Sequence, residues 1–291
     1  MIENGPKVSI IIPVYNGQKT LEQCLDSVLD QTYKNYRIFV VDNNSNDLTK
    51  DIIKKFEVKN NKIKYLFEKN KSVGSARNTG IKNAEGEIFL FTDSDCIAPK
   101  NWIEEMVKPI IFEKESVVMG GGENMIINYW AESIQRGDEN YIERCLRGKY
   151  INTIDGKNFA ADAGLIKELL FDPNIKMLDD FDLYIRLKNR TKIRFLPKIK
   201  VAHFHKCSFF KTAKMNFVRG FWIKKVYNKY SDKSEKNIVN FESISIRNNL
   251  TFPLWMALQL FRNNPKRSFF IFVCELSWRA GLILSLIKKD L

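Results

Sequence analysis

Short apolar runs alternate with segments of helical periodicity along the first hundred residues. Runs of four to eight β-branched and aromatic residues, closed by turn residues, are typical of buried strands. Four such strands are predicted, at 8–16, 36–41, 63–67 and 88–91. Between them, apolar residues recur at helical spacing, as at Leu21, Cys24, Leu25 and Val28. This alternation predicts an α/β fold with a mostly parallel central sheet flanked by helices.

The second hundred residues give fewer signals. The elements expected there are a helix from Pro99, a strand at 117–119, a flexible turn at Gly120–Gly122, a helix from Asp179 and a strand at 201–205. The pattern assigns no element between 129 and 150. Two later apolar segments, 250–261 and 268–287, predict a helical extension. The expected organisation is a domain over 1–205, divided into halves 1–98 and 99–205, and a helical tail over 206–291.

Composition excludes wholesale disorder and a disulfide framework. Apolar residues make up 44% of the 291 residues and charged residues 28%, which is ordinary for a globular protein. The five cysteines are scattered without CxxC spacing, which indicates reduced thiols. The first residues lack the basic and apolar regions of a secretory signal. We therefore expect a cytoplasmic protein.

The excess positive charge lies in the last third of the chain. The net charge is +13, yet residues 1–202 carry 31 basic and 29 acidic side chains, against 16 basic and 5 acidic in 203–291. Aromatic residues lie beside lysines there, next to apolar helices, which favours an anionic membrane face over nucleic acid. Glu275 and Arg279 interrupt the last apolar segment, so an interfacial or packed helical hairpin is expected rather than a membrane span. The alternative is a tail packed on the first domain or on a second subunit.

Two carboxylates, Asp93 and Asp95, follow directly after the strand at 88–91. Open α/β sheets bind ligands at the carboxyl ends of their strands. Side chains two residues apart on an extended chain lean to the same side, so this pair can share a divalent cation. The structural alternative is an Asx-turn that ends the strand.

A second acidic cluster, Asp179, Asp180 and Asp182, opens the helix that continues through Leu183 and Leu187. Acidic residues are favourable at a helix N-terminus because they oppose the helix dipole. The cluster therefore has a structural interpretation as well as a catalytic one.

Four segments together resemble the large family 2 of inverting glycosyltransferases, which have the GT-A fold. They are 8–16, 40–45, 74–80 and 91–95, in this order and spacing. The resemblance covers roughly the first two hundred residues. Asn43-Asn44 departs from it, since many relatives have an acid followed by a small residue. The resemblance implies a nucleotide-sugar-binding half at 1–98 and an acceptor half at 99–205.

Donor contacts follow from the resemblance, position by position. Pro13, Tyr15 and Asp42 match the positions that hold the base and ribose, where a carboxylate can accept hydrogen bonds. Arg77 matches a residue near the diphosphate, and a guanidinium suits phosphate oxygens. Its alternative role is an ion pair on the helix surface with Glu85 or a neighbouring acid.

The resemblance also implies a metal. Asp95 matches the ligand of Mg²⁺ or Mn²⁺, and Asp93 the residue that contacts the ribose or a metal-bound water. A divalent cation would stabilise the negative charge that develops on the leaving diphosphate. Val201–His205 matches a strand that closes the active site; His203 is favoured as a further ligand, although His205 would face the same side.

Catalytic roles complete the resemblance. Asp180 matches the general base that deprotonates the acceptor hydroxyl in a single, inverting displacement. Asp179 stands where glutamate is common, on the acceptor side. Asn158 lies in a segment that resembles the strand lining the acceptor. Asp179 and Asp182 should raise the pKa of Asp180 and Arg186 or a cation should lower it, so no direction is predicted.

The expected partners are a nucleotide-sugar donor, most often UDP-linked in this family, and a glycan or lipid-linked acceptor. The tail predicts peripheral contact with the inner face of the plasma membrane and no nucleic acid partner. Two other interpretations remain. A nucleotidyltransferase would need a glycine-rich phosphate loop after the first strand, which Tyr15-Asn16-Gly17-Gln18 does not supply. A nucleic-acid-binding protein would use the basic tail and bind with steep salt dependence.

Overall fold

The structure, a computed structural model, describes residues 5–204, 208–230, 257–259 and 263–288. The chain forms two compact units. The first comprises Met1–Ile126 and Asp138–His205, and the second Ile127–Gly137 and Lys206–Leu291. Residues 127–137, expected in the first domain, therefore lie with the tail. The division of the first domain at residue 98 stays a prediction.

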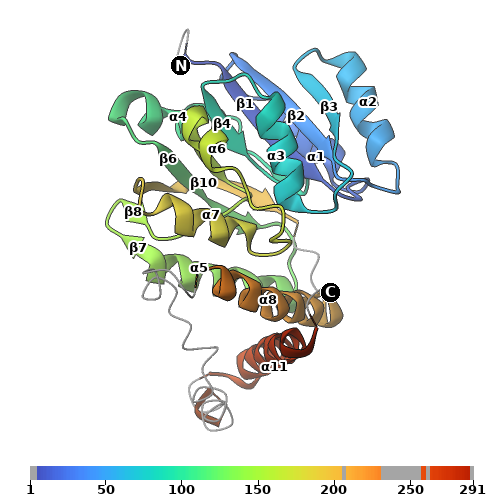
Figure 1. Cartoon of the computed structure of the whole chain (residues 1–291), viewed down its shortest axis with the longest axis vertical. Coiled ribbons are helices and arrows are strands. Elements are labelled where there is room, and N and C mark those ends of the chain that lie inside the picture. The colour runs from blue at the N-terminus through green and yellow to red at the C-terminus, as the bar shows by residue number, and fades with distance from the viewer. Residues whose placement is uncertain (1–4, 205–207, 231–256, 260–262, 289–291) are drawn as a thin grey trace. The chain divides into compact units, whose positions relative to one another are not determined.

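A mixed sheet forms the centre of the first unit (Figure 1). The four predicted strands pair in parallel in the order β3-β2-β1-β4. Their bounds are β1 Val8–Val14, β2 Tyr36–Asp42, β3 Ile63–Phe67 and β4 Ile88–Phe91. β1 and β4 are buried throughout, as expected for strands covered on both faces. Because these strands are parallel, the segments that follow them meet at one edge of the sheet.

The other half of the sheet is mixed. β9 Phe159–Asp162 runs antiparallel between β4 and β6 Val117–Asn124, and β10 Ile193–His203 runs parallel to β6. Three two-residue strands complete it: β5 Cys96–Ile97, β7 Leu146–Arg147 and β8 Tyr150–Ile151. The turn predicted at Gly120–Gly122 is wrong, because these glycines continue β6. A Cβ at Gly120 would overlap the Asn158 amide and the Ile199 carbonyl, so close packing explains the glycine.

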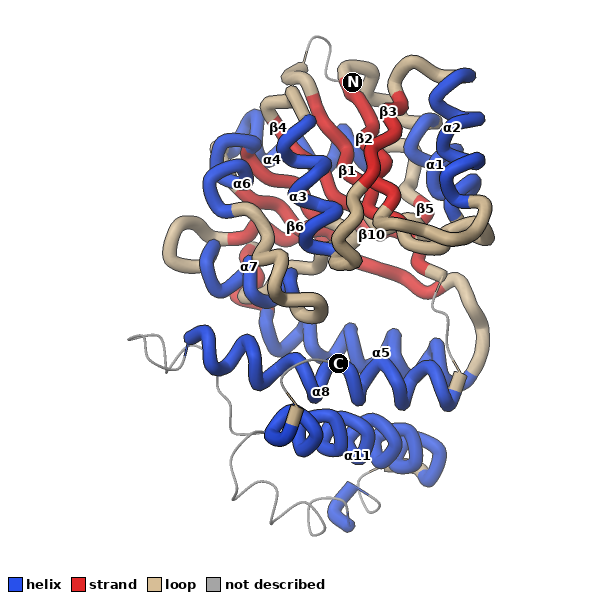
Figure 2. Tube along the Cα trace, turned by 45° about the vertical axis from the view of Figure 1, so that its right-hand side comes forward, coloured by secondary structure: helices blue, strands red, loops and turns tan. Residues whose placement is uncertain are grey.

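Helices cover both faces of the sheet (Figure 2). Alternate residues of β1 point to opposite faces, so Ile10 joins the core under α1, α2 and α4, and Ile11 the core under α3, α6 and α7. The helices are α1 Leu21–Leu29, α2 Thr49–Lys59, α3 Val73–Asn83, α4 Trp102–Glu113, α5 Tyr129–Cys145, α6 Ala163–Leu169 and α7 Asp179–Leu187. α5 occupies most of the range that the sequence left unassigned.

Two long helices, α8 Phe209–Tyr230 and α11 Pro265–Ile287, form most of the second unit as far as the structure describes it. They cross at two glycines: a Cβ at Gly220 would overlap the Trp278 carbonyl, and one at Gly281 the Phe217 carbonyl. The predicted helix over 268–287 is thus confirmed, whereas most of 250–261 lies outside the described residues. In the described part of the chain, α11 alone is long and apolar enough to cross a membrane.

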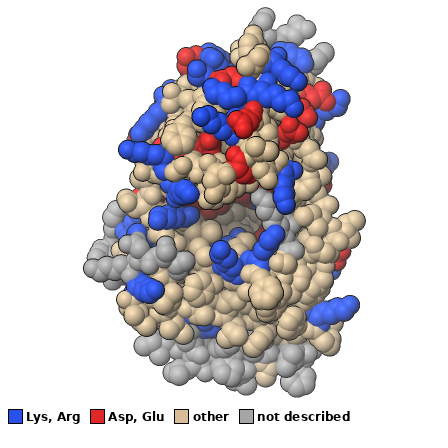
Figure 3. All heavy atoms as spheres, turned by 90° about the vertical axis from the view of Figure 1, so that its right-hand side faces the viewer, with Lys and Arg blue, Asp and Glu red and all other residues tan. Residues whose placement is uncertain are grey.

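An aromatic cluster joins the start of α5 to both long helices of this unit. The ring of Trp130 lies 5.7, 6.2 and 5.9 Å from the rings of Phe209, Phe269 and Phe270. This contact explains why residues 127–137 lie with the second unit. On the face drawn in Figure 3, Lys and Arg mix with Asp and Glu over the first unit, and few acidic side chains show over the second.

Candidate functional site

The carboxyl end of β2 forms the first part of the candidate site. Asp42 is buried there, and its Oδ1 accepts a hydrogen bond of 3.0 Å from the Ser45 backbone N–H. Asn43 Nδ2 donates to the carbonyl oxygens of Glu68 and Asn70, which ties the loop after β3 to the end of β2. Asn44 has a left-handed backbone, with φ of 61°, which asparagine tolerates better than most residues. Local hydrogen bonds and turn geometry therefore accommodate Asn43-Asn44, where many relatives have an acid followed by a small residue.

Pro13 and Tyr15 lie at the end of β1. Pro13 is buried within the strand, so it offers backbone rather than side-chain surface. Tyr15 is 49% exposed, and Lys71 Nζ lies 4.9 Å from its ring centroid and donates to its hydroxyl at 3.3 Å. The pairing of Lys71 with Tyr15 was not predicted, because no sequence pattern links a loop lysine to a strand end 56 residues earlier.

Arg77 connects the two acidic segments of the first unit. Its Nη1 donates to Asp179 Oδ2 at 2.6 Å and its Nη2 to Asp93 Oδ1 at 3.0 Å, while the side chain is 4% exposed. A Cβ at Gly156 would lie 2.5 Å from Nη2, so the guanidinium also packs against the chain at Gly156. The surface ion pair with Glu85 considered for Arg77 is wrong, because Glu85 pairs with Lys7.

Charge complementarity offsets the burial of this group. Burial alone would lower the pKa of Arg77, but the facing charges of Asp179 and Asp93 raise it above its ordinary value. The pKa of Asp93 is raised by burial, and Arg77 opposes that rise. The guanidinium therefore stays charged and holds the turn after β4 against the start of α7.

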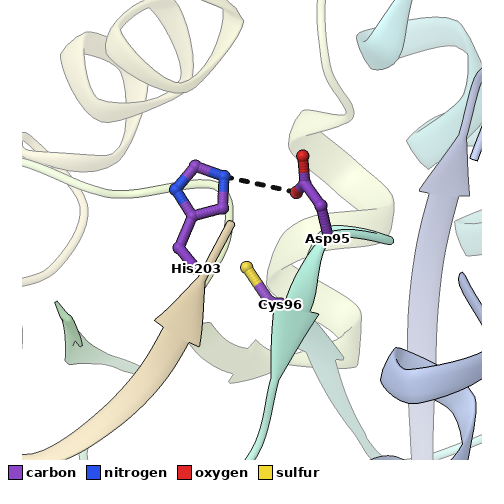
Figure 4. Close-up of side chains that lie close together, drawn as sticks. All are labelled: Asp95, Cys96 and His203. Carbon is purple, nitrogen blue, oxygen red and sulfur yellow. Dashed lines mark ion pairs between the residues drawn. The ribbon is translucent and has the colours of Figure 1, made fainter. Parts of the chain in front are cut away.

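Asp95 turns toward a different partner from Asp93. Its Oδ1 lies 3.3 Å from His203 Nε2, and the dashed line in Figure 4 marks this ion pair. The contact joins the turn after β4 to the end of β10, where His203 pairs with Cys96 of β5. Asp95, Cys96 and His203 each offer one ligand atom, and these atoms lie within 4.8 Å of one another. A carboxylate and an imidazole at this separation fit a divalent cation. His205, the other histidine considered as a ligand, lies outside the described residues.

The three acids at the start of α7 have different environments. Asp179 pairs with Arg77, and Asp182 is fully buried and accepts a hydrogen bond of 3.1 Å from Arg186 Nε. Asp180 instead accepts from the backbone N–H of Phe181 at 2.8 Å. Burial, followed by the nearby charges of Asp179 and Asp155, raises the pKa of Asp180 to about 6, against the opposing charge of Arg77. A carboxylate tuned toward neutral pH suits a general base.

The loop before β9 contributes residues that the sequence did not single out. Asp155 forms an ion pair with Lys157, and the Asp155 carboxylate is close enough to Asp93 and Asp180 to raise the pKa of both. Burial would raise the pKa of Asp155, but Lys157 holds it below its usual value. No motif marks this pair, and only the return of the chain to β9 brings it beside the ends of β4 and α7.

Asn158 does not line an acceptor surface, so that prediction is wrong. The side chain is fully buried, and its Nδ2 donates to the carbonyl oxygens of Gly121 at 2.7 Å and Ile199 at 3.0 Å. Its Oδ1 accepts from Trp102 Nε1 at 2.8 Å. The pairing of β6 and β10 is irregular at this point, between Leu196 and Lys200. Asn158 therefore satisfies backbone groups that the irregular strand pair leaves unpaired.

Comparison with known proteins concerns the domain that holds most of these residues. The family model described as Glycosyl transferase family 2 matches residues 9–163, more than half of the chain. The chain belongs to glycosyl transferase family 2. The matched region contains Asp42, Arg77, Asp93, Asp95 and Asn158. The resemblance found in the sequence is thereby confirmed.

Two relatives of this family 2 member align over 66% and 38% of its length. An uncharacterized glycosyltransferase of Rickettsia typhi is 32% identical over 198 residues, which cover 66% of this chain and 61% of the relative. Glycosyltransferase AglE of Haloferax volcanii is 41% identical over 114 residues, which cover 38% and 37%. The chain thus spans less than two thirds of the length of these relatives.

Solved structures confirm the predicted GT-A fold. The mannosyltransferase PcManGT from Pyrobaculum calidifontis, in complex with GDP-Man and Mn²⁺, has a TM-score of 0.73 at 17% identity, over 98% of this chain and 88% of that one. TarS 1–349 of S. aureus, in complex with UDP, has a TM-score of 0.55 at 17% identity, over 98% and 92%. At these identities the likeness concerns the fold.

Proposed function

We propose that this chain is a metal-dependent, inverting glycosyltransferase. It transfers a sugar from a nucleoside-diphosphate sugar to a hydroxyl group of a glycan or lipid-linked acceptor. The observation that carries the proposal is the joining, through Arg77, of the acidic turn that holds Asp93 and Asp95 to the helix that starts at Asp179 and Asp180. One strand end can thus hold the donor while a carboxylate of raised pKa lies nearby for the acceptor.

The donor side consists of the ends of β1 and β2. Tyr15 offers an exposed ring for the base, and Asp42 accepts hydrogen bonds at the end of β2. Asp93 is assigned to the ribose or a metal-bound water, and Arg77 acts on the diphosphate side chiefly by orienting Asp93. We favour a UDP-linked sugar, as is common in the family. GDP-Man and UDP-GlcNAc, which are bound in PcManGT and TarS, are the natural competitors to test.

The metal would be held by Asp95 and His203, and the ion is Mn²⁺ or Mg²⁺. When bound, such an ion neutralises charge on the departing diphosphate. PcManGT, which shares the fold, is described with Mn²⁺. The fit rests on the 3.3 Å separation between the carboxylate oxygen and the imidazole nitrogen, which are oxygen and nitrogen ligands of the kind that divalent cations accept.

Asp180 supplies the proton acceptor. Its carboxylate takes the proton of the acceptor hydroxyl while that oxygen attacks the anomeric carbon on the side opposite the nucleotide. A single displacement of this kind inverts the anomeric centre and needs no enzyme nucleophile. Asp179 remains on the acceptor side as a positioning residue, because its carboxylate is committed to Arg77.

The second unit supports a peripheral location on the inner face of the plasma membrane. Exposed apolar residues recur along one side of α11, at Phe269, Phe272, Leu276, Ile283, Leu286 and Ile287. Arg279 lies 3.6 Å from Glu275, so the charged pair within this helix is mutually compensated. An apolar stripe on a basic segment suits an anionic bilayer surface, where a lipid-linked acceptor would be found.

A thermal-shift panel tests the proposal. Nucleotides and nucleotide sugars are added with and without Mn²⁺, and a specific donor should raise the unfolding midpoint, because it binds the folded state. Asp95→Ala should abolish the metal-dependent part of this shift, whereas Asp180→Ala should keep the shift and lose transfer. Absence of a shift for every nucleotide sugar, combined with salt-sensitive binding to RNA or DNA, would favour the nucleic-acid-binding alternative.

A further inference from the structure

Strand pairing brings a cysteine to the Asp95–His203 site. β5 and β10 are antiparallel, and Cys96 stands directly opposite His203 in the register. Directly opposed residues of an antiparallel pair project their side chains to the same face, with Cβ atoms about 4.5–5.5 Å apart. Asp95 precedes Cys96 in the chain and turns its carboxylate toward the same point, as Figure 4 shows.

The separations approach those of a tetrahedral metal site. Bonds of about 2.0–2.1 Å to oxygen or nitrogen and about 2.3 Å to sulfur place neighbouring ligand atoms roughly 3.3–3.6 Å apart. The oxygen of Asp95 and the nitrogen of His203 are already 3.3 Å apart. All three ligand atoms, with Cys96 Sγ included, lie within 4.8 Å of one another. For Cys96 Sγ to reach bonding distance of an ion held by the other two atoms, the side chains therefore need to move by about an ångström.

We propose that Cys96 Sγ is a third protein ligand of the cation held by Asp95 and His203. This inference rests on the proposed function, because it concerns the same metal. Binding replaces the S–H bond by an S–metal bond and releases one proton to solvent. A carboxylate, an imidazole and a thiolate form a softer set than oxygen ligands alone. The site therefore takes Zn²⁺ and Cd²⁺ tightly and, of the two ions proposed above, favours Mn²⁺ over Mg²⁺.

Cys24 provides a matched control. It is buried like Cys96 and lies in the same region, but its Sγ contacts the Asp93 carbonyl at 3.4 Å and does not belong to the three-ligand group. If any buried thiol near the acidic turn bound the ion, the two cysteines would behave alike. If the pairing of Cys96 with His203 determines metal binding, only the substitution of Cys96 should weaken it.

The experiment measures metal binding to the full chain without nucleotide. Wild-type protein, Cys96→Ser and Cys24→Ser are titrated with Zn²⁺ by calorimetry and with Cd²⁺ by the ultraviolet thiolate-to-metal charge-transfer band. Loss of one ligand should weaken Zn²⁺ binding on the order of 100-fold in Cys96→Ser and leave Cys24→Ser unchanged. The Cd²⁺ band should saturate at one equivalent in wild type and be lost in Cys96→Ser.

Several outcomes would overturn the proposal. Equal Zn²⁺ affinity in Cys96→Ser and wild type would do so, as would Mg²⁺ binding as tight as Zn²⁺. If Cys96→Ser does not fold, the absence of a saturable Cd²⁺ band in wild type is sufficient to refute the Cys96 ligand. A sugar-transfer assay with Mn²⁺ separates the Cys96 ligand from the proposed glycosyltransferase function. If wild type transfers sugar and Cys96→Ser binds Zn²⁺ as tightly as wild type, only the thiolate ligand is refuted. Cys96-dependent Zn²⁺ binding without turnover of any nucleotide sugar refutes only the proposed function.

Discussion

Replacing Arg77 by methionine should strongly destabilise the first unit. Methionine keeps much of the length of the side chain but removes the charge that faces Asp93 and Asp179 at 3.0 and 2.6 Å. The guanidinium is 4% exposed, and the carboxyl side chains are 33% and 12% exposed. Breaking a buried pair costs about 3–5 kcal/mol, and solvent screening of the more exposed Asp93 places the expected loss near the lower end, about 3 kcal/mol at pH 7.

The deficit should shrink in acid. Arg77 opposes the rise in the pKa of Asp93 that burial causes, so its removal lets this folded-state pKa rise further above the unfolded value. A carboxyl group with a raised folded pKa destabilises the fold when ionised and regains stability once it is protonated. Stability is therefore lost as pH rises above the unfolded pKa of about 3.9, and the difference from wild type should be smaller at pH 5 than at pH 7.

Urea unfolding, followed by circular dichroism at both pH values, gives the free energies to compare. Arg190→Met is the control, because Arg190 pairs with Glu168 while both side chains are largely exposed, and such pairs contribute about 0–1 kcal/mol. Adding Asp179→Asn to Arg77→Met should recover part of the loss. A loss in Arg77→Met no larger than in Arg190→Met, or a loss independent of pH, would refute the reasoning.

Three further predictions concern catalysis, helix packing and the membrane. Because the base must be ionised and the pKa of Asp180 is raised to about 6, kcat/KM should increase from pH 5 to 7 and then level off, and a flat pH profile would contradict this. Asp180→Asn should lower kcat about 10²–10⁴-fold and leave donor affinity unchanged. Gly220→Val should lower the thermal midpoint by several degrees, because it forces α8 and α11 apart. Gly137→Ala, in open space within α5, should leave the midpoint unchanged or raise it, because alanine is the better helix former. A midpoint of Gly220→Val equal to that of wild type would exclude the close crossing. Phe272→Glu combined with Ile283→Glu should weaken sedimentation with anionic vesicles by at least about tenfold, and unchanged partitioning would disprove membrane contact through α11.

The first half of the sheet could be predicted from sequence because its signals are local. The run from Ile88 to Phe91 is apolar without interruption, and it is a strand buried on both faces with Asp93 and Asp95 after it. The same holds for 63–67, where the expected and observed bounds of β3 agree. In each case, buried apolar residues and the turn that follows lie within a few positions of one another.

Other parts depend on contacts between distant segments. The glycines from Gly120 to Gly122 look like a turn, and only the approach of Asn158 and Ile199 explains their place in β6. Asn158 belongs to a segment that resembles an acceptor-lining strand, yet its amide is used to join β6, β10 and Trp102. Cys96 gained a chemical role only through its register opposite His203. No local pattern carries this information.

The proposed function depends above all on metal-dependent donor binding at Asp95. Isothermal titration of the nucleotide sugar selected by the thermal-shift panel, with Mn²⁺ and with a chelator, tests that claim most directly in wild type and in Asp95→Asn. Donor binding by wild type should require Mn²⁺, and Asp95→Asn should lose it. Equal donor affinity in both proteins, or equal affinity with and without Mn²⁺, would contradict it.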